Sequence, residues 1–330
     1  MKLTDLQTPA LVVDRAAFEH NVATMAAALP GPRLRPHVKA HKTTAIARRQ
    51  AEAGHLGFTC ATILEVERLA AAGLGADLML ANEVVDARRL GAVVEGGSRV
   101  TVAVDSEATV TAAADGGVPE VIVDVNVGLP RCGCAPEEAG AVADMARARG
   151  LDVRGVMGYE GHVVGLDDRA KREQMTAECM EKLVQAHGDV GGELISAGGT
   201  GTYDINTWAT EIQAGSYVLM DTAYGRLDLP FRPALTVLAT VISVSQGWAV
   251  ADCGLKALGM DHGNPTMADG DVWFCSDEHV TFAPANTVRV GDRVHVTPAH
   301  VDPTIAYHER MHVVDGDDVV DEWAVDMRGW

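Results

Sequence analysis

The chain has 330 residues, of which 47% are hydrophobic and 22% are charged, and its formal net charge at pH 7 is −19. This composition is typical of a globular protein with a sizeable core. The excess of acidic residues argues against nucleic acid and anionic membrane surfaces as partners, because both require clustered Lys and Arg. The sequence opens without the apolar stretch of a secretion signal and has no apolar run long enough for a bilayer, so we expect a cytoplasmic protein whose six cysteines are reduced thiols.

Over the first two-thirds of the chain, short apolar runs alternate with amphipathic stretches, a pattern typical of repeated βα units. The predicted strands are residues 34–40, 57–61, 78–81, 100–104, 120–127, 153–158, 194–197 and 211–220. Helical patterns precede the first strand or lie between strands, at residues 15–28, 43–53, 63–72, 136–149 and 167–187. Eight strands of this kind favour a (β/α)8 barrel over an open doubly wound sheet.

The final third has a different character, because short β-rich segments are separated there by Gly, Asp and Pro. These segments are residues 236–245, 247–251, 271–274, 292–296, 310–314 and 319–325. The run TPALVV at residues 8–13 predicts one more strand, attached to either part. We therefore expect an α/β protein with a (β/α)8 TIM-like barrel in residues 14–234 and a second, smaller C-terminal β-domain in residues 235–330, which the N-terminal strand 1–13 joins. The strand ends of the barrel would face the cleft between the two parts.

The first predicted barrel strand ends in a strongly basic segment, RPHVKAHKT at residues 35–43. Catalytic groups of such barrels come from the C-terminal ends of strands. On composition alone, a solvated basic turn with outward-pointing lysines explains the segment equally well. The segment resembles the cofactor-lysine motif of fold-type III pyridoxal 5′-phosphate (PLP) enzymes, in the subgroup of D-threonine aldolases and eukaryotic-type D-serine dehydratases. The resemblance implies a Schiff base on Lys39, which follows His-Val. Lys42 is the competitor, and Lys39 is favoured as the expected last inward-pointing residue of the strand.

Two further strand ends resemble the same family. VNVGLPRCG at residues 125–133 carries Arg131, which the resemblance places near the phenolic oxygen of PLP. GYEGH at residues 158–162 carries Tyr159, which the resemblance places against the pyridine ring. Taken alone, Arg131 is equally well explained as a surface residue in a turn.

Two glycine-containing segments follow the last two predicted strands, SAGGTGTY at residues 196–203 and QAGSY at residues 213–217. Backbone N–H groups and Thr hydroxyls in such segments bind anions, and phosphate sites at the last two strands are common in this barrel. Neither segment has the spacing of a Walker loop or a dinucleotide fingerprint. The resemblance implies that Gln213 replaces the arginine that alanine racemases place beside the pyridine nitrogen. Its implied cofactor-binding residues, besides Lys39, Arg131 and Tyr159, are Ser196, Gly199, Thr200, Gln213, Gly215 and Ser216.

The last segment with a chemical pattern is PAHVDPT at residues 298–304. On an extended segment, His300 and Asp302 would project to the same face and could hold one divalent ion, although a surface loop is the better explanation of such a pair taken on its own. In the resembled family the matching position is the metal site. The dehydratases have His-x-Cys there, which suits zinc, whereas the aldolases have His-x-Asp, which suits manganese, magnesium or calcium. The closing segment WAVDMRGW also resembles those aldolases, so that the resemblance extends from Thr8 to Trp330.

The resemblance implies a lyase that uses PLP and a divalent metal, with Mn²⁺ the first choice and Mg²⁺ or Ca²⁺ as alternatives. The expected reaction is aldol cleavage of D-β-hydroxy-α-amino acids with low specificity, such as D-threonine to glycine and acetaldehyde. The implied catalytic residues are Lys39, His300, Arg131 and Tyr159, and the implied assembly is a homodimer acting on a small molecule. The alternatives are a 3-hydroxy-D-aspartate aldolase, a D-serine or D-3-hydroxyaspartate dehydratase, and a non-catalytic PLP carrier.

Overall fold

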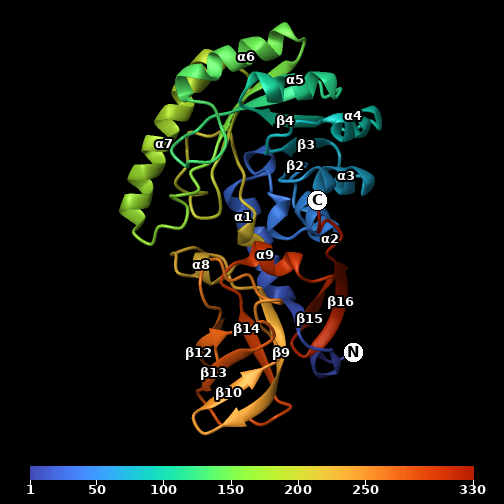
Figure 1. Ribbon diagram of the computed structural model, residues 1–330, viewed down its shortest axis with the longest axis vertical. Helices are drawn as coiled ribbons and strands as arrows, with labels where there is room; N and C mark the ends of the chain where they lie inside the picture. Colours follow the sequence, from blue (N-terminus) through green and yellow to red (C-terminus); the bar gives the residue numbers. More distant parts are fainter. The chain divides into compact units, whose positions relative to one another are not determined.

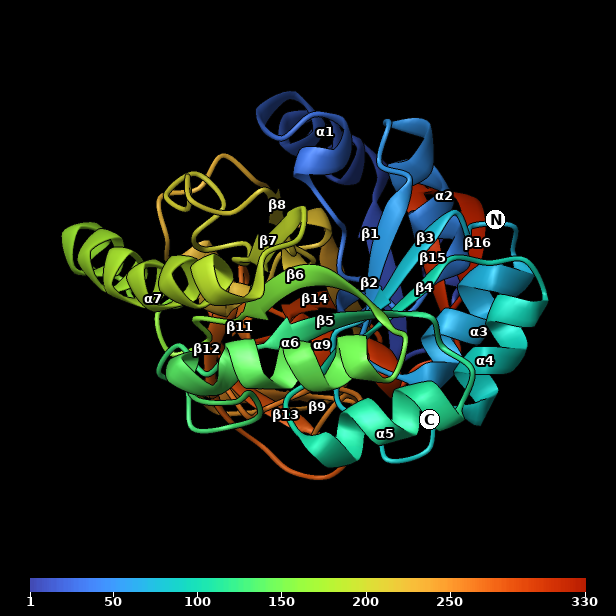
Figure 2. The same ribbon diagram turned by 90° about the horizontal axis from the view of Figure 1, so that it is seen from above.

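The computed structural model describes all residues, 1–330 (Figure 1). Its larger part contains a parallel sheet of seven strands, whose order in the sheet is their order along the chain. Its strands are β2 (Gly57–Cys60), β3 (Asp77–Leu80), β4 (Val100–Val104), β5 (Glu120–Asp124), β6 (Asp152–Gly158), β7 (Leu194–Ala197) and β8 (Glu211–Ile212). The helices between them are α3 (Ile63–Ala71), α4 (Arg88–Glu95), α5 (Glu107–Asp115), α6 (Ala139–Ala148) and α7 (Arg169–Val190), and α2 (Thr44–Glu52) precedes β2. Figure 2 shows α3 to α6 on the outside of the strands, as repeated βα units require.

Residues 34–37 close this sheet into a barrel. Leu34 pairs with Ile212 of β8, and His37 pairs with Thr59 of β2, both in the parallel sense. The amide of Arg35 donates to the Ile212 carbonyl at 2.9 Å. The segment is therefore the eighth strand, and the predicted (β/α)8 barrel is confirmed.

Two barrel strands are shorter than predicted. The predicted strand 34–40 ends early, because Val38–Ala40 forms a single 3-10 turn. Lys39 is thus not a strand residue, and the argument that favoured it as the last inward-pointing residue of the strand was wrong. The predicted strand 211–220 is paired only over β8, and Ser216–Val218 forms another 3-10 turn. The turn supplies its own hydrogen bonds, such as that from the Met220 amide to the Ser216 carbonyl at 2.7 Å, so the chain needs no strand partner there.

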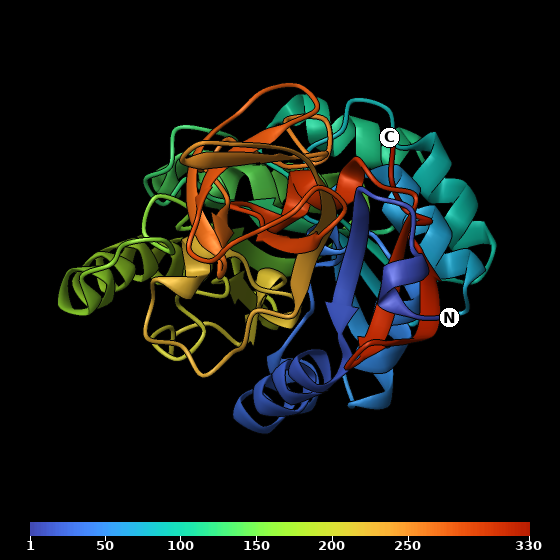
Figure 3. The same ribbon diagram turned by 90° about the horizontal axis from the view of Figure 1, so that it is seen from below.

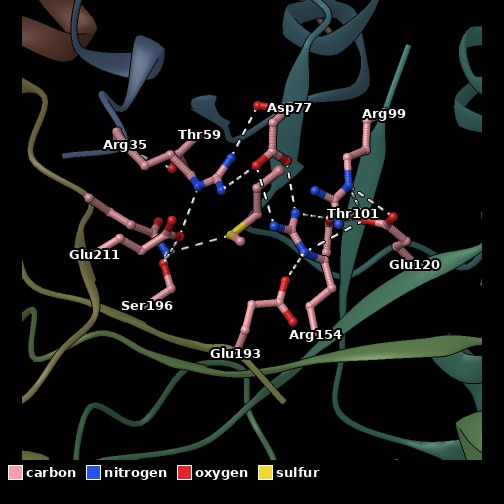
Figure 4. Close-up of polar contacts among 12 residues, drawn as sticks. Arg35, Thr59, Asp77, Arg99, Thr101, Glu120, Arg154, Glu193, Ser196 and Glu211 are labelled. Atoms are coloured by element: carbon pink, nitrogen blue, oxygen red, sulfur yellow. Dashed lines mark hydrogen bonds and ion pairs between the residues drawn. The ribbon is translucent and has the colours of Figure 1, made fainter. Parts of the chain in front are cut away.

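Charged side chains form a buried network inside the barrel (Figure 4). Arg35 Nη2 and Arg154 Nη1 each lie 2.8 Å from a carboxylate oxygen of Asp77, and Arg35 Nε lies 2.8 Å from Glu211 Oε1. The arginine side chains are only 5% and 4% exposed. Burial alone would raise the pKa of Asp77, but the hydrogen bonds and charges of Arg35 and Arg154 outweigh it and lower that pKa to about 2. The network therefore stays ionised at neutral pH.

The second sheet has nine strands in the order β10-β13-β12-β11-β14-β9-β1-β15-β16. These are β1 (Ala10–Asp14), β9 (Leu235–Ser245), β10 (Trp248–Ala251), β11 (Thr266–Met267), β12 (Gly270–Cys275), β13 (Val280–Pro284), β14 (Arg293–Thr297), β15 (Arg310–Asp315) and β16 (Asp318–Ala324). Because β9 also pairs with β10, six of these strands close into an antiparallel barrel. The N-terminal strand β1 is antiparallel to β9 and parallel to β15, and Figure 3 shows it in blue beside the red C-terminal strands. The predicted smaller β-domain is confirmed, although β11 and β13 were not predicted.

The chain divides into two compact units. Unit 1 comprises Met1–Thr24, Ala40–Ala45 and Ser216–Arg328, and unit 2 comprises Met25–Lys39, Ile46–Gly215 and Gly329–Trp330. The boundary passes through the basic segment, so that Lys39 belongs to unit 2 and Lys42 to unit 1. None of the helices combines the length and the apolar character needed to cross a membrane.

Three more helices complete the fold: α1 (Arg15–Ala28), α8 (Thr222–Gly225) and α9 (Val301–Ala306). Helix α9 contradicts the expectation that His300 and Asp302 lie on an extended segment. His300 has an extended backbone, but Asp302 lies in the first helical turn. Pro303 is compatible with this turn, because the first amides of a helix have no acceptor within it. The amide of Val301 instead donates to Asp221 Oδ2 at 3.0 Å.

Candidate active site

Lys39, Arg131 and Tyr159 lie together in unit 2. Tyr159 directly follows β6, Arg131 lies in the turn after β5, and Lys39 lies in the 3-10 turn after the first barrel strand. Lys39 Nζ lies 5.7 Å from the centroid of the Tyr159 ring, and the Arg131 guanidinium carbon lies 5.4 Å from it. Two cations thus lie within cation–π distance of one aromatic ring at the C-terminal ends of the strands. This arrangement fits an anionic aromatic cofactor.

Two glycines, Gly161 and Gly199, lie beside the Tyr159 ring. A Cβ at Gly161 would lie 2.6 Å from Tyr159 Cε1, so any side chain there would displace the ring. A Cβ at Gly199 would lie 3.5 Å from Tyr159 Cε2, so the glycine-rich segment after β7 lies directly beside the ring. Thr200, in the same segment, is almost fully buried at 1% exposure. The predicted anion-binding segment and the predicted ring-stacking tyrosine are therefore neighbours.

Glu160 is a buried carboxylate that sequence reasoning missed. It is completely buried, and it accepts hydrogen bonds from the Gly198 amide at 3.2 Å, the Thr202 hydroxyl at 2.9 Å and the Asn206 side-chain amide at 3.4 Å. Burial raises the pKa of Glu160, and these hydrogen bonds work against that rise. The available signal was an acidic residue between Tyr159 and Gly161 at the end of a buried strand. Glu160 therefore joins the Tyr159 turn to the glycine-rich segment.

A second buried acid, Asp124, ends β5 close to Arg131. Burial raises its pKa well above the usual range, and the neighbouring carboxyl of Glu83, to which it is hydrogen-bonded, raises it further. Cys132 also contacts Glu83, which raises the pKa of the thiol to about 11. Cys132 and Cys134 are both free thiols. A small cavity opens at this point, and Asp124, Arg131, Cys132 and Tyr159 are among its lining residues.

The remaining predicted residues of unit 2 lie in β7 or directly after β8. Ser196 is fully buried in β7, and its hydroxyl donates to Glu211 Oε1 at 2.6 Å. Gln213 follows β8 and donates from Nε2 to Ser196 Oγ at 2.8 Å. Gly215, two positions after Gln213, is buried. Ser196 thus contacts the buried charged network.

The predicted metal ligands belong to unit 1, as does Ser216. His300 Nε2 lies 3.9 Å from Asp302 Oδ1, and both side chains are about one-fifth exposed. Asp302 Oδ1 is buried and takes part in no hydrogen bond. An ionised oxygen without a donor is costly in such a position, and a cation between it and the imidazole would satisfy it. The pair therefore fits a divalent ion.

Two neighbours of His300 were not predicted. Asp261 Oδ2 lies 2.7 Å from His300 Nδ1, and the ring of His262 stacks on that of His300 with centroids 4.0 Å apart. Asp261, His262 and His300 together could also hold a metal ion. Asp221 holds the start of α9, which carries His300 and Asp302, because its carboxylate accepts from the amides of both Tyr224 and Val301. Asp261 lies 39 positions before His300, so spacing along the sequence gave no signal for it.

The comparisons with known proteins extend over the whole chain. Residues 13–223 match the family model described as alanine racemase, N-terminal domain, and residues 234–314 match the model described as putative serine dehydratase domain. A 3-hydroxy-D-aspartate aldolase from Paracoccus denitrificans (strain Pd 1222) is 33% identical, with 100% of this chain and 94% of the relative covered. A D-threonine aldolase from an Arthrobacter species is 32% identical, with 99% and 94% covered.

The solved structures agree with these matches. The crystal structure of D-threonine aldolase from Filomicrobium marinum superposes with a TM-score of 0.92 at 32% identity, with 100% of this chain and 98% of that chain covered. Both sequence relatives and this structure thus align from end to end, and the two family models lie side by side along the chain. The chain belongs to the D-threonine aldolase and D-serine dehydratase-like family of alanine racemase-like enzymes.

Proposed function

We propose that this chain is a lyase that cleaves D-β-hydroxy-α-amino acids, with D-threonine giving glycine and acetaldehyde, and that it needs PLP and a divalent metal. The observation that carries the aldolase assignment is the pair His300 and Asp302, whose Nε2 and Oδ1 atoms lie 3.9 Å apart and whose Oδ1 is buried without a hydrogen bond. An imidazole and a carboxylate form the N/O donor set that Mn²⁺ accepts, with Mg²⁺ and Ca²⁺ as alternatives. The end-to-end similarity to two proteins named as aldolases supports the same reaction.

The family implies PLP, and Lys39 is the lysine that would hold it. When bound, PLP supplies the electron sink for cleavage of the bond between the α- and β-carbons. Tyr159 would pack against the ring of the cofactor, and Arg131 would hold its phenolic oxygen in the ionised form. The segment containing Gly199 and Thr200 would bind the phosphate, with Gly215 and Ser216 as further contacts. Gln213 would lie beside the pyridine nitrogen of the cofactor, and Ser196, whose Oγ accepts from Gln213 Nε2 at 2.8 Å, would hold it there.

Asp261 would orient the metal ligand. The Nδ1–H group of His300 donates to Asp261 Oδ2 in this arrangement, so the lone pair of Nε2 is directed away from Asp261. Nε2 is the nitrogen on the side of Asp302. A metal held between Nε2 and Asp302 would bind the β-hydroxyl of the substrate and lower its pKa.

The test compares D-threonine, L-threonine, D-serine and 3-hydroxy-D-aspartate as substrates of the PLP-loaded chain, with Mn²⁺ and after chelation. We expect glycine and acetaldehyde from D-threonine only with metal, and nothing from L-threonine. Glycine and glyoxylate formed faster from 3-hydroxy-D-aspartate would favour the other aldolase. Pyruvate or oxaloacetate with ammonia, and no glycine, would identify a dehydratase and contradict the proposal.

We further infer that the chain is a cytoplasmic homodimer that acts on a small molecule and has neither nucleic-acid nor membrane partners. The net charge of −19 supports the absence of anionic partners. Exposed apolar side chains on the β-domain, including the neighbouring Trp248 and Trp273, support an interface between copies. The molar mass in solution by light scattering tests this inference, and a monomer of 34.8 kDa contradicts it.

A further inference from the structure

A chain of hydrogen bonds runs from the buried charged network to the side chain of Gln213. Arg35 Nε lies 2.8 Å from Glu211 Oε1, the hydroxyl of Ser196 lies 2.6 Å from the same oxygen, and Gln213 Nε2 lies 2.8 Å from Ser196 Oγ. Figure 4 shows Arg35, Glu211 and Ser196 in this order. Arg35, Glu211 and Ser196 are all buried, so water does not compete for these bonds.

The direction of every bond in this chain is fixed. The guanidinium of Arg35 can only donate, so Glu211 Oε1 accepts from it. The single hydrogen of the Ser196 hydroxyl therefore points to Glu211, and Ser196 Oγ can only accept from Gln213. It follows that the NH₂ group of Gln213, and not its carbonyl oxygen, faces Ser196.

The second N–H group of Gln213 is also engaged. Gln213 Nε2 lies 3.8 Å from the sulfur of Met79, which is a weak acceptor. Both donors of the amide are thus directed into the barrel wall. Rotation of the amide by half a turn would place its carbonyl oxygen against Ser196 Oγ, which has no hydrogen left to donate, and would leave a buried group unsatisfied. Gln213 can therefore offer only an acceptor to a ligand.

We propose that Gln213 is locked as a hydrogen-bond acceptor and that it requires a protonated pyridine nitrogen on the cofactor. The inference rests on the proposed function, in which Gln213 takes the place beside that nitrogen. An arginine in the same place can only donate, so it is compatible only with the neutral nitrogen. A protonated ring withdraws electrons more strongly, which suits cleavage of a carbon–carbon bond. Ser196 and Glu211 are positioning residues in this arrangement, because they act through Gln213.

The test is ¹⁵N NMR of the chain loaded with PLP that is enriched at the pyridine nitrogen, and it needs no substrate. In the unmodified protein we expect the chemical shift of a protonated pyridine at neutral pH. In Ser196→Ala the amide is free to rotate, and in Gln213→Leu the acceptor is absent. Both variants should lower the ratio of protonated to neutral nitrogen by about tenfold, as expected for the loss of one hydrogen bond to a charged group.

Thr101→Val is the matched control, because Thr101 bonds to Arg154 in the same buried network but not to Gln213. It should leave the nitrogen protonated. A neutral nitrogen in the unmodified, PLP-loaded protein overturns this inference and leaves the proposed reaction standing. A chain that binds no PLP overturns both. Equal loss of protonation in Thr101→Val and Ser196→Ala also overturns the inference, since the effect would then be that of any damage to the network.

Discussion

Replacement of Glu160 by Gln should weaken the binding of the phosphate group of PLP specifically. Glu160 accepts three hydrogen bonds in a fully buried position, from Gly198, Thr202 and Asn206. A glutamine has one oxygen in place of two, so its NH₂ group would face the amide of Gly198, and two donors would meet. An unsatisfied buried donor costs about 1–3 kcal/mol. The neutral glutamine avoids the cost of burying a charged carboxylate, since burial disfavours the charged form of Glu160, and this offsets part of the cost of the unsatisfied donor.

The displaced group would be the Gly198 amide, at the start of the segment that we propose for phosphate binding. We therefore expect the affinity for PLP to fall about tenfold to a hundredfold, which corresponds to the upper part of that cost. The affinity for pyridoxal, which has no phosphate, should change by no more than about twofold on the same scale. Absorbance titrations of Glu160→Gln with both compounds measure the two affinities.

Glu178→Gln is the matched control, because Glu178 lies on α7 and its hydrogen bond with Gln174 is exposed. It should bind both compounds as the unmodified chain does. An equal loss of PLP and pyridoxal affinity in Glu160→Gln would refute the reasoning, because it would show that the substitution damages the site as a whole. Unchanged affinity for both would refute it as well.

Three further predictions concern the metal site and the raised pKa of Asp124. Asp302→Ala should abolish metal-dependent turnover of D-threonine while the absorbance of bound PLP is retained, and unchanged turnover would remove the metal from the mechanism. Asp261→Asn should weaken Mn²⁺ binding by about tenfold to a hundredfold, because loss of a carboxylate that orients a ligating imidazole has that effect. EPR of the free Mn²⁺ ion measures this affinity, and equal affinity in the variant and the unmodified chain would show that Asp261 does not orient His300. The raised pKa of Asp124, caused first by burial and then by Glu83, means that the folded state holds a proton which the unfolded state releases at lower pH. Stability should therefore fall as the pH rises from about 4 through the folded pKa. The thermal midpoint of Asp124→Asn should fall less over the same interval, and parallel pH profiles for the two proteins would contradict this assignment.

The sequence by itself determined the fold class and the family. The period of the apolar residues predicted strands close to those observed for β2, β4 and β7, and the change of pattern near residue 235 predicted the antiparallel domain. These features depend on the local spacing of apolar residues, which can be read from each short segment of the sequence without knowing its tertiary contacts. The motif around Lys39 and the pair His300 and Asp302 indicated the family, which the end-to-end relatives confirm. The roles of these three residues stay predictions.

The local sequence pattern did not predict correctly where strands end and where short helices begin. The segment from Val38 to Ala40 was expected to continue the first barrel strand, yet it forms a 3-10 turn. The segment with His300 and Asp302 contains a proline and was expected to be extended, yet it begins α9. At the start of α9 a distant group supplies a backbone hydrogen bond, because the Asp221 carboxylate accepts from the Val301 amide. Tertiary partners override local preference at such positions.

Only the tertiary structure decided how the candidate site residues are held. Glu160 meets a segment that begins 38 positions later, and Asp261 meets His300 39 positions later. The lock on Gln213 needs Arg35, Glu211 and Ser196, which come from three different strands of a closed barrel. Hydrogen-bond direction depends on which donors and acceptors are buried together, and the order of residues along a chain does not contain that information. The sequence therefore determined the groups available for the chemistry, and the closure of the barrel decided which way those groups point.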